Sequence, residues 1–145
     1  MLEGDLLTRV GAARVARLAT IDPDGGAHLV PICFVLDGEV LYTAVDQKPK
    51  RSRRLRRLRN VRERSWASVI VDHYEEDWSL LWWVVLQGPA RVLESGEEAR
   101  RALVLLAGKY PQYRREPPDG PVIALSVTEW RGWEASPARL GSQDG

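Results

Sequence analysis

Seventeen residues, from Lys48 to Arg64, contain ten lysines and arginines and a single acid, Glu63. This segment carries a net charge of +9, and the rest of the chain carries −8, because the whole chain has only +1. Such a concentration of cations requires anions, which a bound ligand, a partner or acidic neighbours in the fold could supply. This segment is therefore the first candidate for a functional site.

The order of residues in this segment favours a phosphate site. The pattern predicts a strand that ends at Val45, then a basic loop, then a helix at 52–62 with Ser52 as its N-cap. The free N–H groups of a first helical turn bind phosphate, and nearby cations strengthen the site. The cations placed to reach it are Lys48, Lys50, Arg51 and Arg54.

Two other interpretations of the segment exist. Many arginine-rich helices simply present a solvated polar face. Nucleic-acid binding is disfavoured by the acidic remainder of the chain and by the lack of a recognisable nucleic-acid module, so we expect no nucleic-acid partner. The arginines from Arg56 onward stay open, either as contacts to a longer ligand or as solvent-facing charge.

Few other residues could do chemistry. His28 and Tyr42 lie in predicted strands, where either could give a proton to a reacting group, and each could equally have no catalytic role. His73 follows Asp72, but two histidines without ligand spacing predict no metal site. The single cysteine, Cys33, fits a small core residue better than a nucleophile.

Turn signals divide the chain into short β-like runs. Asp22-Pro23-Asp24-Gly25-Gly26 and Asp37-Gly38 predict tight turns, and Gly88-Pro89 predicts a bend within one long strand. The runs predict six strands, at 14–21, 27–36, 39–45, 66–71, 80–93 and 122–133, and three helices, at 2–13, 52–62 and 96–113. The expected fold is mainly β, with six antiparallel strands closed into a barrel and about three inserted helices.

Composition predicts one domain at 1–136, followed by a disordered tail at 137–145. No apolar run reaches the length of a membrane span, and the first residues do not resemble a signal peptide, so we expect a cytoplasmic protein with no membrane partner. Of the neighbours Trp82 and Trp83, one is expected in the core and the other outside, where a dimer interface would cover it.

Several motifs together resemble a known family. They are Leu18-Ala19-Thr20-Ile21, His28-Leu29-Val30-Pro31-Ile32-Cys33-Phe34, Lys48-Pro49-Lys50-Arg51-Ser52-Arg53-Arg54-Leu55, Ala67-Ser68-Val69-Ile70-Val71-Asp72, Asp77-Trp78 and Gly88-Pro89-Ala90. In this order and spacing, over 14–135, the chain resembles the split β-barrel flavoproteins of the pyridoxamine 5′-phosphate oxidase type. The resemblance is closest to the actinobacterial branch that uses the deazaflavin coenzyme F420.

The resemblance implies a homodimer with two cofactor sites at its interface. It implies that backbone groups of Val30, Pro31, Ile32 and Cys33 contact the polar edge of the cofactor ring. It also implies a phosphate clamp made of Lys48, Lys50, Arg51, Ser52 and Arg54, although flavin-using relatives often have lysine at the position of Arg51. Trp78 matches an aromatic residue that lies beside the cofactor in deazaflavin-using relatives.

The function that this implies is an oxidoreductase that transfers hydride from reduced coenzyme F420 to a small organic acceptor. The deazaflavin has an acidic tail beyond its phosphate, which suits a site with more cations than one phosphate needs. An FMN-dependent oxidoreductase of the same fold and a non-catalytic cofactor carrier remain as alternatives.

Overall fold

The computed structural model describes residues 4–45 and 51–135, with only the backbone described for 51–55. The helices are α1 (Gly4–Ala12), α2 (Arg51–Arg64), α3 (Glu97–Lys109), α4 (Pro111–Arg115) and the single 3₁₀ turn η1 (Trp78–Leu80). The strands are β1 (Ala16–Ile21), β2 (Ala27–Ile32), β3 (Val35–Asp37), β4 (Val40–Ala44), β5 (Trp66–His73), β6 (Trp82–Leu93), β7 (Val122–Ser126) and β8 (Glu129–Glu134). The predicted fold class, mainly antiparallel β with a few helices, is confirmed.

The strands follow the order β2-β1-β5-β6-β7-β4-β3, and every pair is antiparallel. The long strand β6 changes partner midway: residues up to Gln87 pair with β8, and residues from Ala90 pair with β7. The predicted bend at Gly88-Pro89 lies at this change. β2 and β3 are the two ends of the path, and the short link Cys33–Phe34 joins them, so the sheet curls around one core.

The described residues form eight strands rather than six, because two predicted strands are each divided. The run at 27–36 breaks at Phe34, whose buried side chain points into the core and whose N–H bonds to the hydroxyl of Tyr110 at 3.1 Å. The run at 122–133 breaks at Val127 and Thr128, where the chain crosses β6. The predicted helix at 96–113 divides at Pro111, because proline cannot donate the next helical hydrogen bond.

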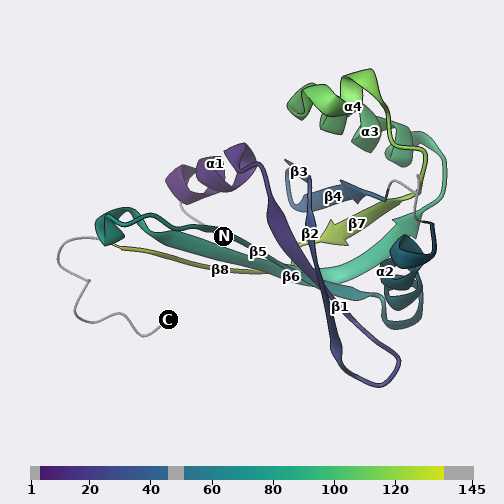
Figure 1. Ribbon diagram of the computed structural model, residues 1–145, viewed down its shortest axis with the longest axis horizontal. Coiled ribbons are helices and arrows are strands. Elements are labelled where there is room, and N and C mark those ends of the chain that lie inside the picture. Colours follow the sequence, from purple (N-terminus) through teal and green to yellow (C-terminus); the bar gives the residue numbers. More distant parts are fainter. Residues whose placement is uncertain (1–3, 46–50, 136–145) are drawn as a thin grey trace.

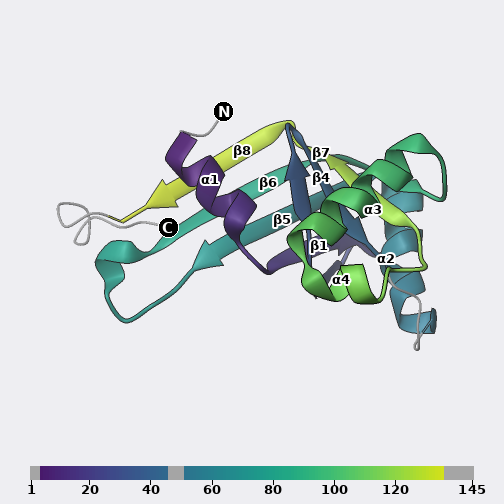
Figure 2. The same cartoon turned by 90° about the horizontal axis from the view of Figure 1, so that it is seen from above.

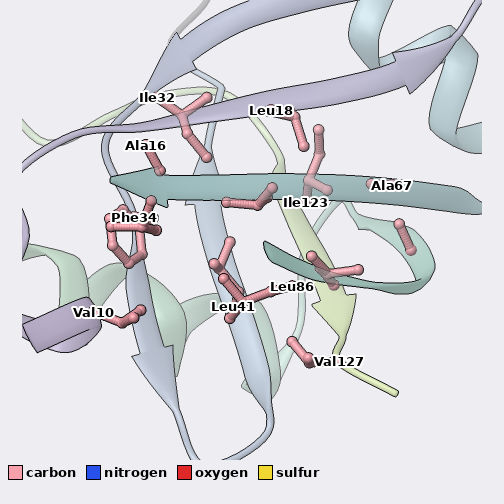
Figure 3. Close-up of a cluster of buried hydrophobic side chains, with 14 of the residues drawn as sticks. Val10, Ala16, Leu18, Ile32, Phe34, Leu41, Ala67, Leu86, Ile123 and Val127 are labelled. Atoms are coloured by element: carbon pink, nitrogen blue, oxygen red, sulfur yellow. The ribbon is translucent and has the colours of Figure 1, made fainter. Parts of the chain in front are cut away.

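The core fills the barrel between the two halves of the sheet (Figure 3). Buried and less buried residues alternate along β1, β5 and β6, which contribute Leu18, Val69 and Leu86 to the core. These side chains join Phe34 and Leu41 in the same cluster. A second cluster lies outside the barrel, where α3 packs on β4 and β7. Core formation therefore fixes both the barrel and the helices that cover it.

The predicted tight turns are confirmed. Gly25 has φ +91° in the turn after β1, and Gly38 has φ +61° in the two-residue turn between β3 and β4. Only glycine adopts such angles without strain. The predicted inward and outward positions of the adjacent tryptophans are confirmed, because Trp82 lies in the core and Trp83 points to the outside of the sheet; its cover by a dimer interface stays a prediction.

Beyond the barrel, β5, β6 and β8 continue as an extended arm, with η1 at its tip (Figure 1). Helix α2 lies at the opposite end of the molecule, and the view from above agrees (Figure 2). Among the described residues, no helix is long and apolar enough to span a membrane.

Candidate functional site

Helix α2 begins where the sequence analysis expected an anion site. Strand β4 ends at Ala44, and the next helix starts at Arg51, one residue earlier than predicted. Ser52 therefore lies in the first turn of α2 and not at the N-cap position. That turn contains no acidic residue, so nothing in it neutralises the positive end of the helix dipole.

The predicted clamp falls partly outside the described structure. Lys48 and Lys50 belong to the undescribed residues 46–50, and the structure describes the backbone but not the side chains of Arg51, Ser52 and Arg54. The helix that would present them is present, and their contact with a phosphate stays a prediction.

A polar network of Asp22, Arg56 and Asn60 holds α2 against the end of β1. The carboxylate of Asp22 accepts hydrogen bonds from Arg56 Nε at 3.0 Å and Arg56 Nη2 at 2.6 Å. Asn60 is fully buried, and its Nδ2 donates to Asp22 at 2.9 Å and to Thr20 Oγ1 at 3.2 Å. The Arg56 guanidinium and Asn60 hold the pKa of Asp22 well below its usual range. This network fixes the direction in which α2 points.

Three of the arginines from Arg56 onward have partners within the fold. Arg56 pairs with Asp22, Arg62 pairs with Glu94, and Arg64 donates to the carbonyl of Pro23 at 2.9 Å. These partners lie more than thirty residues away in sequence. Acidic neighbours in the fold therefore account for Arg56 and Arg62, and a backbone carbonyl holds Arg64.

Replacing Asn60 tests how strongly the network anchors α2. We expect Asn60→Ala to lower the free energy of unfolding by about 1–3 kcal/mol, because Asp22 and Thr20 lose a buried donor. Urea denaturation followed by circular dichroism measures this change. Asn60→Asp is a sharper variant, since it places a second carboxylate beside Asp22 and should destabilise more. Equal stability of Asn60→Ala and the unmodified chain would contradict the anchoring role.

His28 lies on β2 beside this network, in register with Thr20. Its Nδ1 is buried and has no hydrogen-bond partner among the described residues. Burial and the nearby Arg56 charge lower the pKa of His28, so its imidazole is neutral at pH 7. A neutral ring can donate or accept a hydrogen bond, but it lacks the imidazolium proton that a general acid delivers.

Tyr42, the other candidate proton donor, faces away from the barrel and is buried beneath α3. Its hydroxyl donates to Glu98 Oε2 at 2.7 Å, and Arg91 holds the same carboxylate from two nitrogens. Burial and the Glu98 carboxylate raise the pKa of Tyr42 to about 12. The hydroxyl proton of Tyr42 is therefore held in a structural hydrogen bond to Glu98.

The four residues predicted to contact the cofactor ring differ in position. Val30 and Ile32 point toward the core, Pro31 is exposed on the outer face, and Cys33 is half-buried at the corner into β3. The carbonyl of Cys33 already accepts a hydrogen bond from Thr43 Oγ1 at 2.7 Å. Because β2 ends the sheet path, alternate backbone groups of Val30 to Ile32 face away from β1. Those groups are the ones free to bind a ring.

Trp78 opens η1 at the tip of the arm, where its side chain is 53% exposed. Its indole N–H donates to the hydroxyl of Tyr74 at 3.3 Å, and that hydroxyl donates to Glu76. Helix α2 lies at the other end of the described structure, so η1, which Trp78 opens, is far from α2 within one chain (Figures 1 and 2).

The family model for pyridoxamine 5′-phosphate oxidase matches residues 2–134. The chain belongs to this family. No curated protein matches the chain.

Several solved structures share this fold. The conserved hypothetical protein Rv2991 from Mycobacterium tuberculosis has a TM-score of 0.74 at 20% identity, covering 100% of this chain and 91% of that one. A heme binding protein from Mycobacterium smegmatis has a TM-score of 0.68 at 20% identity, covering 87% of this chain and 51% of that one. The FAD binding protein from the same organism has a TM-score of 0.58 at 15% identity, covering 92% and 96%.

One further feature of this pyridoxamine 5′-phosphate oxidase family member was missed by the sequence analysis. A groove with a volume of about 410 Å³ lies on the outer face of the arm. We call it the arm groove; the side chains on that face that line it are Ile70, Asp72, Trp83, Val85, Arg131 and Trp133. The sequence indicated an outward tryptophan here, but nothing in it indicated which strand lies beside β6.

The structure also offers no metal centre in the part of the chain that it describes, where no three His, Cys, Asp or Glu side chains gather. His73 contacts Glu75 through its Nε2 and stacks on Trp82. Both contacts of His73 therefore lie within the arm.

Proposed function

We propose that this chain is an oxidoreductase that uses reduced coenzyme F420 to reduce a small organic acceptor. The observation that carries the proposal is the amino end of α2, which follows β4 closely in a barrel of the pyridoxamine 5′-phosphate oxidase family. An acid-free first turn next to five cations suits a phosphate and a further acidic group. Those cations are Lys48, Lys50, Arg51, Arg53 and Arg54.

The residues present fit such a cofactor in two places. Backbone N–H groups at the start of α2 can bind its phosphate, and Arg51, Ser52 and Arg54 belong to the same helical turn. The free edge of β2 at Val30 to Ile32 offers backbone groups for a planar ring, as a strand edge commonly does for a ligand. His28 stays neutral and can contribute a hydrogen bond at the same strand.

When bound, the reduced deazaflavin supplies a hydride for transfer to the acceptor. The protein orients the cofactor and the acceptor and excludes water from the site. The Asp22–Arg56–Asn60 network holds α2 in a fixed direction, which keeps its amino end in place for the phosphate. The side chains described here provide no obvious general acid, so water is the expected source of any proton.

The proposal includes a homodimer. Leu29 is 67% exposed and Ile70 37% exposed on the outer face of β2, β1 and β5, where Pro31 is also exposed. An exposed apolar surface of this kind favours association with a second copy. Two copies would also allow the partner subunit's Trp78 to approach a cofactor held by α2, which a single chain does not permit.

A binding titration tests the proposal. Coenzyme F420 and FMN are each titrated into the full-length protein, and we expect tighter binding of the deazaflavin. Arg51→Gln with Arg54→Gln should weaken deazaflavin binding at least tenfold with unchanged circular dichroism, because charge-assisted bonds to phosphate are lost. Arg115→Gln, on an exposed helix elsewhere, is the matched control.

The alternatives predict different outcomes. A protein that is yellow as isolated and releases FMN on denaturation would support the FMN-dependent oxidoreductase, in line with the FAD binding protein of the same fold. A non-catalytic carrier would bind reduced coenzyme F420 yet leave every acceptor unreduced. Binding of neither cofactor would overturn the proposed function.

A further inference from the structure

His28 lies on the face of β2 that helix α2 covers. In the antiparallel pair of β1 and β2, His28 stands opposite Thr20, and residues in such a pair point to the same face of the sheet. The Thr20 hydroxyl accepts a hydrogen bond at 3.2 Å from the Nδ2 of Asn60, which is fully buried on α2. The imidazole therefore lies at the contact between the sheet and α2, next to the Asp22–Arg56–Asn60 network.

The charged groups that face this imidazole are mostly cations. They are Asp22 at the end of β1 and, on α2, Arg56, Arg57 and Arg59. The Asp22 carboxylate accepts two hydrogen bonds from Arg56 and one from Asn60, so it is already engaged and does not pair with the ring. Three guanidinium groups and one engaged carboxylate leave the surroundings of the ring positive, which opposes a further positive charge there.

The buried nitrogen of the ring has no acceptor for a proton. His28 Nδ1 is buried and has no hydrogen-bond partner within the described part of the chain. A neutral imidazole can leave this nitrogen without a proton, but an imidazolium carries an N–H on both nitrogens. Asn60 Oδ1 is likewise buried without a partner, and it makes no hydrogen bond to Nδ1. Protonation therefore buries an unsatisfied donor beside three cations, and a movement of the ring out of the contact relieves both costs.

We propose that His28 is a positioning residue for α2: its neutral ring lets the helix pack on the sheet, and its protonated ring drives the two apart. Burial and the Arg56 charge lower the pKa of His28 below its ordinary value of about 6.5, in agreement with this geometry. The contribution of the neutral ring to the packing of α2 is therefore complete above about pH 6.5, and it is lost as the pH falls through the lowered pKa.

The groups around the ring do not compensate for this change. Hydrogen bonds from Arg56 and Asn60 hold the pKa of Asp22 far below its usual range, so its carboxylate stays ionised in mild acid. The arginines stay cationic over the same range. Among the described groups that face α2 at this point, His28 is therefore the one whose charge changes between about pH 5.5 and 7.5.

The consequence for ligand binding rests on the proposed function. There, the first turn of α2 binds the phosphate of the cofactor, and Arg56 lies in the next turn of the same helix. A helix displaced from the sheet loses the fixed direction on which that contact depends, so acid should weaken cofactor binding. His28 acts here through α2 and does not need to touch the ligand.

Hydrogen exchange in the cofactor-free protein, measured by mass spectrometry on peptides from α2 at pH 5.5 and 7.5, tests the inference. The exchange rate of the unmodified chain is divided by that of His28→Gln at the same pH, which removes the intrinsic pH dependence of exchange. We expect this ratio to be about threefold larger, or more, at pH 5.5 than at pH 7.5. Peptides from α3 should show no such change, since α3 packs on the second cluster.

The matched control is His73→Gln, because the chain has only two histidines and His73 ends β5 on the arm, away from α2. This variant should loosen α2 in acid as much as the unmodified chain does. Proton NMR of the unmodified chain gives a second measurement. The Cε1 proton of His28, assigned through its contact with Thr20, should titrate with a midpoint below about 6.5.

A titration with coenzyme F420 at the same two pH values tests the link to the proposed function. From pH 7.5 to pH 5.5, the unmodified chain should lose about threefold more affinity than His28→Gln loses. The titration of the cofactor itself cancels in this comparison, because both proteins meet the same ligand. His73→Gln should lose as much affinity as the unmodified chain.

An exchange ratio that is the same at both pH values would overturn the inference, as would a midpoint for His28 at or above about 6.5. If α2 loosens through His28 while the loss of affinity is equal in both proteins, cofactor binding does not depend on the position of α2, and the link fails. Absence of coenzyme F420 binding at either pH counts against the proposed function alone, because exchange in the cofactor-free protein still decides the role of His28.

Discussion

Gly88→Ala is expected to destabilise the protein by about 2–3 kcal/mol, a cost typical of forcing one methyl group into a packed core. A Cβ at position 88 would lie 2.1 Å from the carbonyl oxygen of Ser126 and 2.9 Å from Thr128 Oγ1. The first of these atoms belongs to the backbone and cannot rotate away. Relief therefore requires the β7–β8 connection to move off β6, at the point where β6 changes partner.

Urea denaturation followed by tryptophan fluorescence measures this loss. Gly108→Ala is the matched control, because a Cβ there meets nothing within 4 Å and alanine favours the helix in which it lies. We expect the midpoint of Gly88→Ala to fall and that of Gly108→Ala to stay or rise slightly. Equal midpoints for the two variants would contradict the tight crossing at Gly88.

The sequence predicted the features that depend on a few neighbouring residues. The turns at Gly25 and Gly38, the bend at Gly88 and the outward position of Trp83 all follow from local backbone rules. The break at Phe34 could not be predicted in this way. No glycine or proline stands there, and the chain turns because Phe34 is buried and its N–H meets Tyr110, 76 residues away.

The same distinction applies to the candidate site. The strand-to-helix junction before Arg51 was predictable, because strand and helix patterns adjoin in the sequence. The pairing of Arg56 with Asp22 was not, since it depends on how α2 packs on β1. The arm groove was not predictable either, because Trp83 meets Trp133 only through the register of β6 with β8.

Local sequence therefore indicates where cations gather, and tertiary packing decides which of them are free. Packing pairs Arg56 with Asp22 and Arg62 with Glu94, and it leaves Arg131 without a counterion among the described side chains. This lowers the excess charge available to a deazaflavin tail by two arginines, and the start of α2 remains its main source. A preference for the deazaflavin over FMN would then come mainly from this short segment, which binding experiments can address directly.

A chain with both Leu29→Glu and Ile70→Glu is expected to be monomeric. Both side chains lie on the outer face of the sheet and are exposed in the single chain, and the proposed interface would bury them. Burying an unpaired carboxylate costs several kcal/mol, more than a marginal interface can offset. Light scattering after size-exclusion chromatography should show the mass fall from twice 16.4 kDa to 16.4 kDa.

The monomer should also bind coenzyme F420 more weakly, although neither substitution touches α2. If a cofactor held by α2 contacts the partner subunit's Trp78, separating the chains removes that aromatic contact, which is worth about 1 kcal/mol or more. Val104→Glu is the matched control, since Val104 is 70% exposed on α3, away from this face. A doubly substituted chain that keeps its dimer mass would contradict the interface. A monomer with unchanged affinity would show instead that each chain holds its cofactor alone.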